Sequence, residues 1–124
     1  MRGVSRPLLL LILAVALSCS SAPAELTGID WERWKSDRNG CESKRIGYVA
    51  PLKEQINKLK ARSEMDIVNL MGRPDETELL KRNQKFYSYY LAGSPACPSS
   101  DSVATKLVIR FNAMGLAKEV ALEP

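Results

Sequence analysis

The sequence predicts an α+β fold of two layers, with N-terminal helices packed on one face of a three- to four-stranded antiparallel meander sheet. Three observations support this fold class. Apolar residues recur at helical spacing up to Pro74, they alternate with a period of two beyond it, and turn signals separate the later segments. Roughly one hundred residues follow an N-terminal apolar segment, which is the length of one small domain.

The first helix is expected over residues 31–35. Asp30 can cap its N-terminus, and Asn39-Gly40 would end the segment. Trp31 and Trp34 stand three positions apart and therefore share one helical face. They either cover an edge of the core or form an aromatic patch that touches lipid headgroups or a protein partner.

Two further helices are expected before the sheet. One starts at Pro51, a suitable first-turn residue, and runs to about residue 62. Its apolar positions at i, i+4 and i+7 form one buried stripe: Leu52, Ile56 and Leu59. Ser63 then caps a third helix whose first turn is acidic, and Gly72, followed closely by a proline, ends it.

Alternation with a period of two predicts the strands. They are expected at residues 78–82, 85–91, 106–112 and 116–122. Within the second strand, Tyr87, Tyr89 and Leu91 fall on one face, and Tyr90 falls on the other. Residues 92–103 are rich in Gly, Pro and Ser and are expected to form a long loop, whereas residues 112–115 form a tight turn.

The composition argues against several classes of function. The chain has no histidine, which removes Ser-His-Asp and Cys-His nucleophile systems and His-ligated zinc. Its charges are interspersed, and without Arg2 and Arg6 sixteen basic residues face fourteen acidic ones. Such a surface does not indicate nucleic-acid binding. We expect no enzymatic activity, no cofactor, no metal and no small-molecule substrate.

The N-terminus has the layout of a secretory signal peptide. Arg2 and Arg6 precede an apolar run over residues 8–17, which ends in Ser18-Cys19. Ten residues cover only about 15 Å as a helix, too little to span a bilayer core of about 30 Å. A cysteine directly after a small residue is what a bacterial lipoprotein signal requires. We therefore expect cleavage of residues 1–18, lipid attachment at Cys19, and a short tether over residues 19–29 ahead of a domain at residues 30–124.

A second cleavage site competes with the first. Ala22-Pro23-Ala24 is an A-x-A sequence, and cleavage before Glu25 would discard Cys19. The protein would then be soluble in the periplasm or secreted. In this alternative it is an inhibitor or binding module that uses its sheet face or its 92–103 loop.

The remaining cysteines form an even pair. Cys19 is either lipidated or discarded, which leaves Cys41 and Cys97. In an oxidising compartment such a pair is typical of a disulfide rather than of two free thiols. Closing a loop of this length would contribute about 4 kcal/mol in the chain-entropy model.

Several segments together resemble a known family. The stretch A-R-S-E-M-D-I-V-N-L-M-G-R-P over residues 61–74 is similar to the G-M-[ST]-x-x-x-V-x-x-x-L-G-x-P signature of small outer-membrane lipoproteins of the SmpA/OmlA/BamE type. The matching positions are Ser63, Ile67, Met71, Gly72 and Pro74. The aromatic segment 86–90 and the segment 107–115, with its F-N-x-x-G ending, also match, so the similarity covers roughly residues 50–122. Ala61-Arg62 replaces the usual Gly-Met, and the cysteine pair and long loop are not general features of the family.

The resemblance implies a fold like that of β-lactamase inhibitor protein and a role without catalysis. The implied location is the periplasmic face of the bacterial outer membrane. The implied job is a scaffold or accessory factor in envelope integrity or in the assembly of β-barrel proteins, with an outer-membrane protein or assembly complex as partner. Ser20 and Ser21 after Cys19 favour the outer membrane as destination. The candidate partner contacts are the aromatic residues Trp31, Trp34, Tyr87, Tyr89 and Tyr90.

Overall fold

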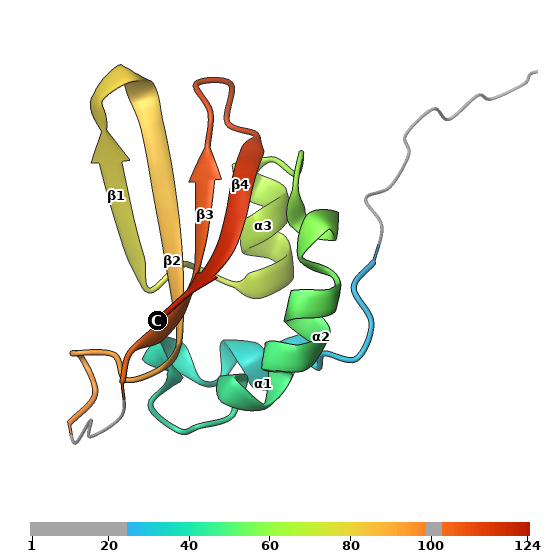
Figure 1. The fold of residues 1–124 in the computed structure, drawn as a ribbon, viewed down its shortest axis with the longest axis vertical. Coiled ribbons are helices and arrows are strands. Elements are labelled where there is room, and N and C mark those ends of the chain that lie inside the picture. The colour runs from blue at the N-terminus through green and yellow to red at the C-terminus, as the bar shows by residue number, and fades with distance from the viewer. Residues whose placement is uncertain (1–24, 99–102) are drawn as a thin grey trace, which may run out of the picture.

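The computed structural model describes residues 25–98 and 103–124 as short helices packed on one face of an antiparallel sheet, as predicted (Figure 1). The predicted signal peptide and Cys19 lie outside the described residues. The α-helices are α1 (Trp31–Lys35), α2 (Val49–Glu54) and α3 (Glu64–Met71). The 3₁₀ turns are η1 (Arg38–Gly40), η2 (Arg45–Tyr48), η3 (Ile56–Leu59) and η4 (Lys81–Asn83). The strands are β1 (Glu76–Leu80), β2 (Gln84–Ala92), β3 (Thr105–Phe111) and β4 (Ala117–Glu123), in the order β1-β2-β3-β4.

Helices α1 and α3 begin and end where their capping residues predict. The Asp30 carboxylate accepts hydrogen bonds from the N–H groups of Glu32 and Arg33, at 3.1 and 3.2 Å. The Ser63 hydroxyl accepts one from the N–H of Asp66 at 3.1 Å, and Gly72 ends α3 with a φ of 86°. Across the described part of the chain, none of the helices combines the length and apolarity needed to cross a membrane.

The prediction of one helix from Pro51 to about residue 62 is wrong. Helix α2 begins at Val49 and ends at Glu54, after which the chain continues as η3. At the break, the side-chain amide of Gln55 accepts the N–H of Thr27 at 2.7 Å and donates to its carbonyl at 2.7 Å. Through these two hydrogen bonds Gln55 binds the N-terminal segment to the domain. The stripe residues Leu52 and Leu59, on either side of the break, are both fully buried.

The first strand starts two residues earlier than predicted. Arg82 and Asn83 have φ values of 66° and 58°, which strand geometry does not allow, so this part of the chain forms the hairpin turn. Strand β1 therefore ends at Leu80 and pairs with β2 in the register Thr77↔Tyr87. The other strands lie within one residue of their predicted bounds. Residues 93–98, the described part of the chain directly after β2, form turns and irregular structure, in line with the predicted loop.

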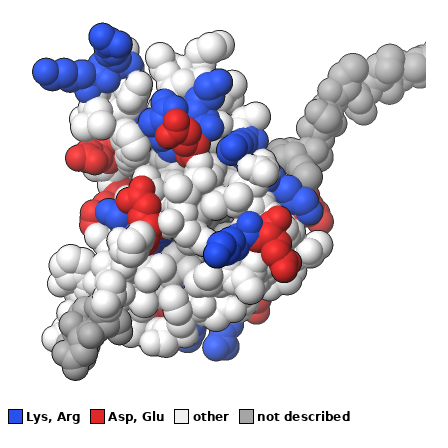
Figure 2. All heavy atoms as spheres, in the orientation of Figure 1, with Lys and Arg blue, Asp and Glu red and all other residues white. Residues whose placement is uncertain are grey.

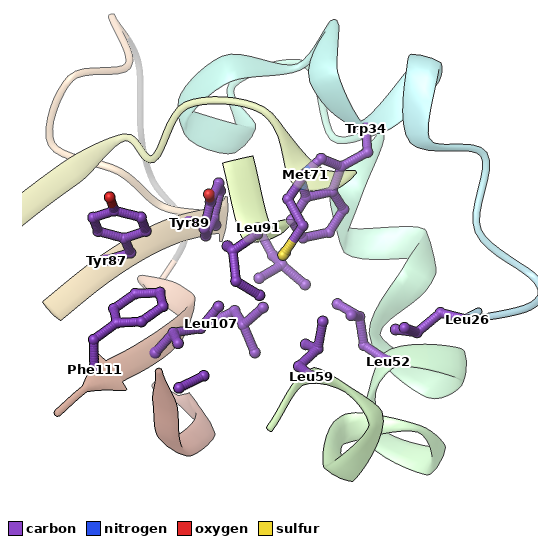
Figure 3. Packing of buried hydrophobic residues seen from close by; sticks show 13 residues of the cluster. Leu26, Trp34, Leu52, Leu59, Met71, Tyr87, Tyr89, Leu91, Leu107 and Phe111 are labelled. Carbon is purple, nitrogen blue, oxygen red and sulfur yellow. The ribbon is translucent and has the colours of Figure 1, made fainter. Parts of the chain in front are cut away.

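The core lies between the helices and the inward face of the two central strands (Figure 3). Strand β2 contributes Tyr87, Tyr89 and Leu91, which share the face that their alternation predicts. Strand β3 contributes Leu107, Ile109 and Phe111, and β4 contributes Ala117. The helices and flanking segments complete the cluster with Leu26, Trp34, Leu52, Leu59, Ile67 and Met71. Each large apolar side chain contributes roughly 1.5–3 kcal/mol when fully buried.

Turn η1 lies directly against the end of β2. A Cβ atom on Gly40 would come within 2.6 Å of the carbonyl carbon and oxygen of Leu91. Gly40 also has a φ of 66°, a conformation that side chains with a Cβ rarely adopt. This position therefore requires glycine for both reasons.

We expect Gly40→Ala to lower the free energy of unfolding by roughly 2 kcal/mol or more, because the added methyl group meets backbone that cannot give way. Urea denaturation measures the effect. Gly47→Ala is the matched control, since nothing lies within 4 Å of a Cβ at Gly47 and its φ is ordinary. Equal stability of the two variants would contradict the close packing of η1 on β2.

Candidate functional site

Arg45 and Asp75 form a buried ion pair at the disulfide end of the sheet. The distance between Arg45 Nη1 and Asp75 Oδ2 is 2.7 Å, and the two side chains are 1% and 0% exposed. Asp75 also accepts the backbone N–H groups of Asn39 at 3.0 Å and Tyr90 at 2.7 Å. One carboxylate thus binds η1, η2 and β2, which are far apart in the sequence.

The Arg45 guanidinium makes three further contacts. Its Nε donates to the Trp34 carbonyl at 2.9 Å, and its Nη1 also donates to the Tyr90 carbonyl at 3.1 Å. The guanidinium carbon lies 4.8 Å from the centre of the Trp34 ring, which is a cation–π distance. The charge of Arg45 is therefore balanced, and its Nε and Nη1 donate to acceptors within the domain.

A second buried carboxylate shapes the loop that carries Arg45. Asp37 is fully buried and accepts the backbone N–H groups of Glu42, Lys44 and Arg45 at 2.7, 2.8 and 3.0 Å. These donors would otherwise lack partners, because residues 41–44 form no regular helix or strand. Asp37 thus folds residues 38–45 around itself and sets the position from which Arg45 enters the core.

The structure contains the predicted disulfide between Cys41 and Cys97, with 5.4 Å between their Cα atoms. The bond joins the segment after η1 to the loop after β2. In the same region the Ser94 hydroxyl donates to the Asn39 side chain at 3.4 Å, and Cys97 N donates to the Ser94 carbonyl at 3.0 Å. The disulfide and the Asp75 carboxylate therefore both hold η1 in place.

Most of the aromatic residues predicted as partner contacts are buried. Trp34 and Tyr89 are 0% exposed, Tyr87 is 9% exposed and Tyr90 is 6% exposed. These four residues therefore lack the exposure on which a contact role depends, and Trp34, Tyr87 and Tyr89 belong to the core cluster. Tyr90 lies on the other face of the sheet, where Lys106 stands 5.7 Å from its ring centre. Trp31 alone keeps partial exposure, and its ring centre lies 5.6 Å from that of Trp34.

The tyrosine hydroxyls are bound to acceptors inside the domain. Tyr90 donates to Glu76 at 2.7 Å, Tyr89 donates to the Gly72 carbonyl at 2.7 Å, and Tyr87 donates to Glu64 at 3.1 Å. The hydrogen bond to Glu76 and burial raise the pKa of Tyr90 to about 12. Burial raises the pKa of Tyr89 and, together with the bond to Glu64, that of Tyr87.

A pocket of about 120 Å³ opens beside the ion pair. It is lined by Lys35, Arg38, Arg45, Met71, Gly72 and Arg73. Lys35 donates to the Asn69 carbonyl at 3.3 Å, and Arg38 donates to the Pro74 carbonyl at 3.3 Å. These cations bind carbonyls at and beyond the C-terminus of α3, where positive charge stabilises a helix. Among the described residues, no three His, Cys, Asp or Glu side chains are grouped so as to hold a metal ion.

Comparison with known proteins adds little to this geometry. No protein-family model and no curated protein matches the chain. A solved structure assigned provisionally as the osmotically inducible lipoprotein OsmE is similar, with a TM-score of 0.42 and 19% sequence identity over 60% of this chain and 82% of that one. A likeness this distant carries no argument about function. Membership of the family that the sequence resembles therefore stays a prediction.

The sequence does not single out Asp37, Arg45 and Asp75. Each is an ordinary charged residue in a segment that reads as a loop or helix end, and the three are up to 38 positions apart. The only local signal is Asp75 directly after Pro74, just before the strands begin. Recognising the cluster requires knowing that η1, η2 and β2 converge.

We expect Asp75→Ala to lower the free energy of unfolding by about 3–5 kcal/mol, because it leaves the Arg45 charge buried without its partner. The double variant Arg45→Met/Asp75→Ala should lose less than the sum of the two single variants, because no charge is left unpaired. Urea denaturation of the four proteins gives the coupling energy. Glu119→Ala, which breaks the exposed pair with Arg110, is the control and should change little. Additive losses at Arg45 and Asp75 would contradict a coupled pair.

The free energy of unfolding should also decline at alkaline pH, because Tyr90 then loses its proton. The pKa of this side chain is about 10 in an unfolded chain and about 12 in the fold, so the folded state retains the proton longer. The contribution is complete below pH 10 and is lost as the pH rises through about 12. The free energy of unfolding should therefore decline across this range, and less steeply in Tyr90→Phe. Identical slopes for the two proteins would contradict this assignment.

Proposed function

We propose that this protein is a non-enzymatic lipoprotein, anchored through Cys19 on the periplasmic face of the bacterial outer membrane. Its domain acts there as a scaffold or accessory factor in envelope integrity or β-barrel assembly. The observation that carries the proposal is the N-terminal segment, in which a cationic start and an apolar run of ten residues end in Ser18-Cys19.

The position of the first packed residue supports an anchoring role. Leu26 is 7% exposed and belongs to the core, and Thr27 is bound to Gln55 through both its backbone N–H and its carbonyl. The packed part of the chain thus begins before Asp30, within the predicted tether. Leu26 lies seven positions after Cys19, and this length of chain spans at most about 25 Å. A lipid at Cys19 would therefore keep the domain close to the bilayer.

The buried charged side chains of Asp37, Arg45 and Asp75 all bind other parts of the domain, which supports a role without catalysis. Asp37 is occupied by three backbone donors, and Asp75 and Arg45 bind each other and the backbone around them. The disulfide closes the same region covalently. These groups hold segments together, which suits a rigid module that presents a surface to partners. Trp31 is the predicted contact residue that remains available for this purpose.

We expect the wild-type protein to fractionate with the outer membrane and Cys19→Ser to appear in the soluble fraction, because the variant has no thiol to acylate. Mass spectrometry of the mature N-terminus should find Cys19 as the first residue, carrying a diacylglyceryl group. Ser21→Ala is the matched control and should remain in the membrane fraction.

Two outcomes would contradict the proposal at different points. A soluble wild-type protein that begins at Glu25 would remove the anchor and favour the secreted binding module. An anchored protein that copurifies with no outer-membrane protein from detergent-solubilised envelopes would remove the assembly role.

A further inference from the structure

The two edges of the sheet differ in how they are covered. At the start of β4, Ala61 N donates to the Ala117 carbonyl at 2.8 Å and Ala117 N donates to the Arg62 carbonyl at 2.9 Å. Strand β1 pairs only with β2, and within the described chain no backbone hydrogen bond reaches its outer edge. Figure 1 shows β1 at the margin of the sheet with no helix beside it. An open strand edge is a template for pairing with another strand.

Strand β1 is exposed along its whole length and includes two leucines. All five of its residues are exposed, with Leu79 at 67% and Leu80 at 44%. Large exposed apolar side chains on an unpaired edge favour association, because a second strand would cover them.

Acidic and basic side chains occupy different parts of β1 and its turn. Glu76 and Glu78 stand at the start of the strand, and Lys81 and Arg82 form the turn that follows it. Figure 2 shows basic side chains at the top of this margin, over the hairpin turn, and acidic ones below them. Within the described residues, Glu78, Lys81 and Arg82 make no side-chain hydrogen bond or ion pair. This end-to-end charge pattern is complementary to itself when two copies run antiparallel.

We propose that β1 pairs antiparallel with β1 of a second copy of this chain, which joins two four-stranded sheets edge to edge about a two-fold axis. The acidic start of each β1 then lies beside the basic turn of the other copy. This self-association goes beyond the membrane anchor proposed above and does not depend on it.

The charges also distinguish between two registers near the middle of β1. A two-fold axis at Glu78 places two like charges directly opposite each other, which is destabilising. An axis at Leu79 instead sets Leu79 against its own copy and Glu78 against Leu80, and it brings Glu76 near Arg82 of the second copy. In this register the two copies of Leu79 cover each other and the unlike charges approach.

Sedimentation equilibrium of the mature chain with Cys19→Ser, which carries no lipid, tests the association. The weight-average mass should rise with concentration toward that of a dimer, and the rise should weaken at high salt. Glu78→Lys, and separately Lys81→Glu/Arg82→Glu, should each weaken association on the order of tenfold, because each places like charges beside one another twice.

Mixing the two charge variants should recover part of the association, because the lysine introduced in one chain then lies beside glutamates introduced in the other. Recovery is partial because Glu76 of the first chain still lies near the glutamate that replaces Arg82. Glu54→Lys makes the same charge change as Glu78→Lys on an exposed position of α2, and Lys53→Glu reverses the charge of an exposed lysine there. Both are controls and should associate like the parent chain. Circular dichroism confirms that every variant is folded.

Cross-linking tests the register. Leu79→Cys should form a disulfide between copies on mild oxidation, since directly opposite residues have Cα atoms about 4.5–5.5 Å apart. Thr77→Cys lies on the same face of the same strand but opposite a different residue, so it should not cross-link. A parent chain that stays monomeric at all concentrations would overturn the proposal. Association that survives both charge variants, or a failure of their mixture to recover any association, would also overturn it.

Discussion

The burial of Arg45 is the constraint around which the disulfide end of the domain is organised. A guanidinium removed from water is costly unless a carboxylate and further acceptors replace its hydration. Here the replacements come from three places: the carboxylate of Asp75, the carbonyls of Trp34 and Tyr90, and the face of the Trp34 ring. None of these groups is close to Arg45 in the sequence. Helix α1, turn η2 and strand β2 must therefore all be in place before the charge is satisfied.

The disulfide and the ion pair stabilise the same junction by different means. The Cys41–Cys97 bond restricts the unfolded chain, which is effective for a domain too small to have a large core. The contacts of Asp75 and Asp37 instead act in the folded state, by supplying acceptors to backbone N–H groups of irregular segments. With few regular hydrogen bonds available between residues 36 and 48, side-chain carboxylates take the place of secondary structure.

The chain itself partly covers the sheet edge at β4 and leaves the edge at β1 open. Residues 61–63, which connect η3 to α3, bind the beginning of β4, so the chain itself occupies part of that edge. Strand β1 has no such cover, because the chain enters it directly from the C-terminus of α3 through Pro74 and Asp75. The helices pack over the central strands and end before they reach β1 (Figure 1). The exposed leucines and the separated charges of β1 are consequences of this topology, and any partner that binds there meets unpaired backbone.

Local chemistry by itself determined much of this fold. The caps at Asp30 and Ser63, the stop at Gly72 and the alternation of Tyr87, Tyr89 and Leu91 depend on neighbours a few residues away, and the structure confirms them. The even cysteine pair likewise indicated the disulfide. Tertiary structure decided what depends on distant contacts. Gln55 binds Thr27 at the break between α2 and η3, and Tyr87 and Tyr89 are buried because the helices cover that face of their strand. The pairing of Arg45 with Asp75 arises only when η2 meets the entry to β1, since burial is a property of the assembled fold and not of a charged residue's immediate sequence.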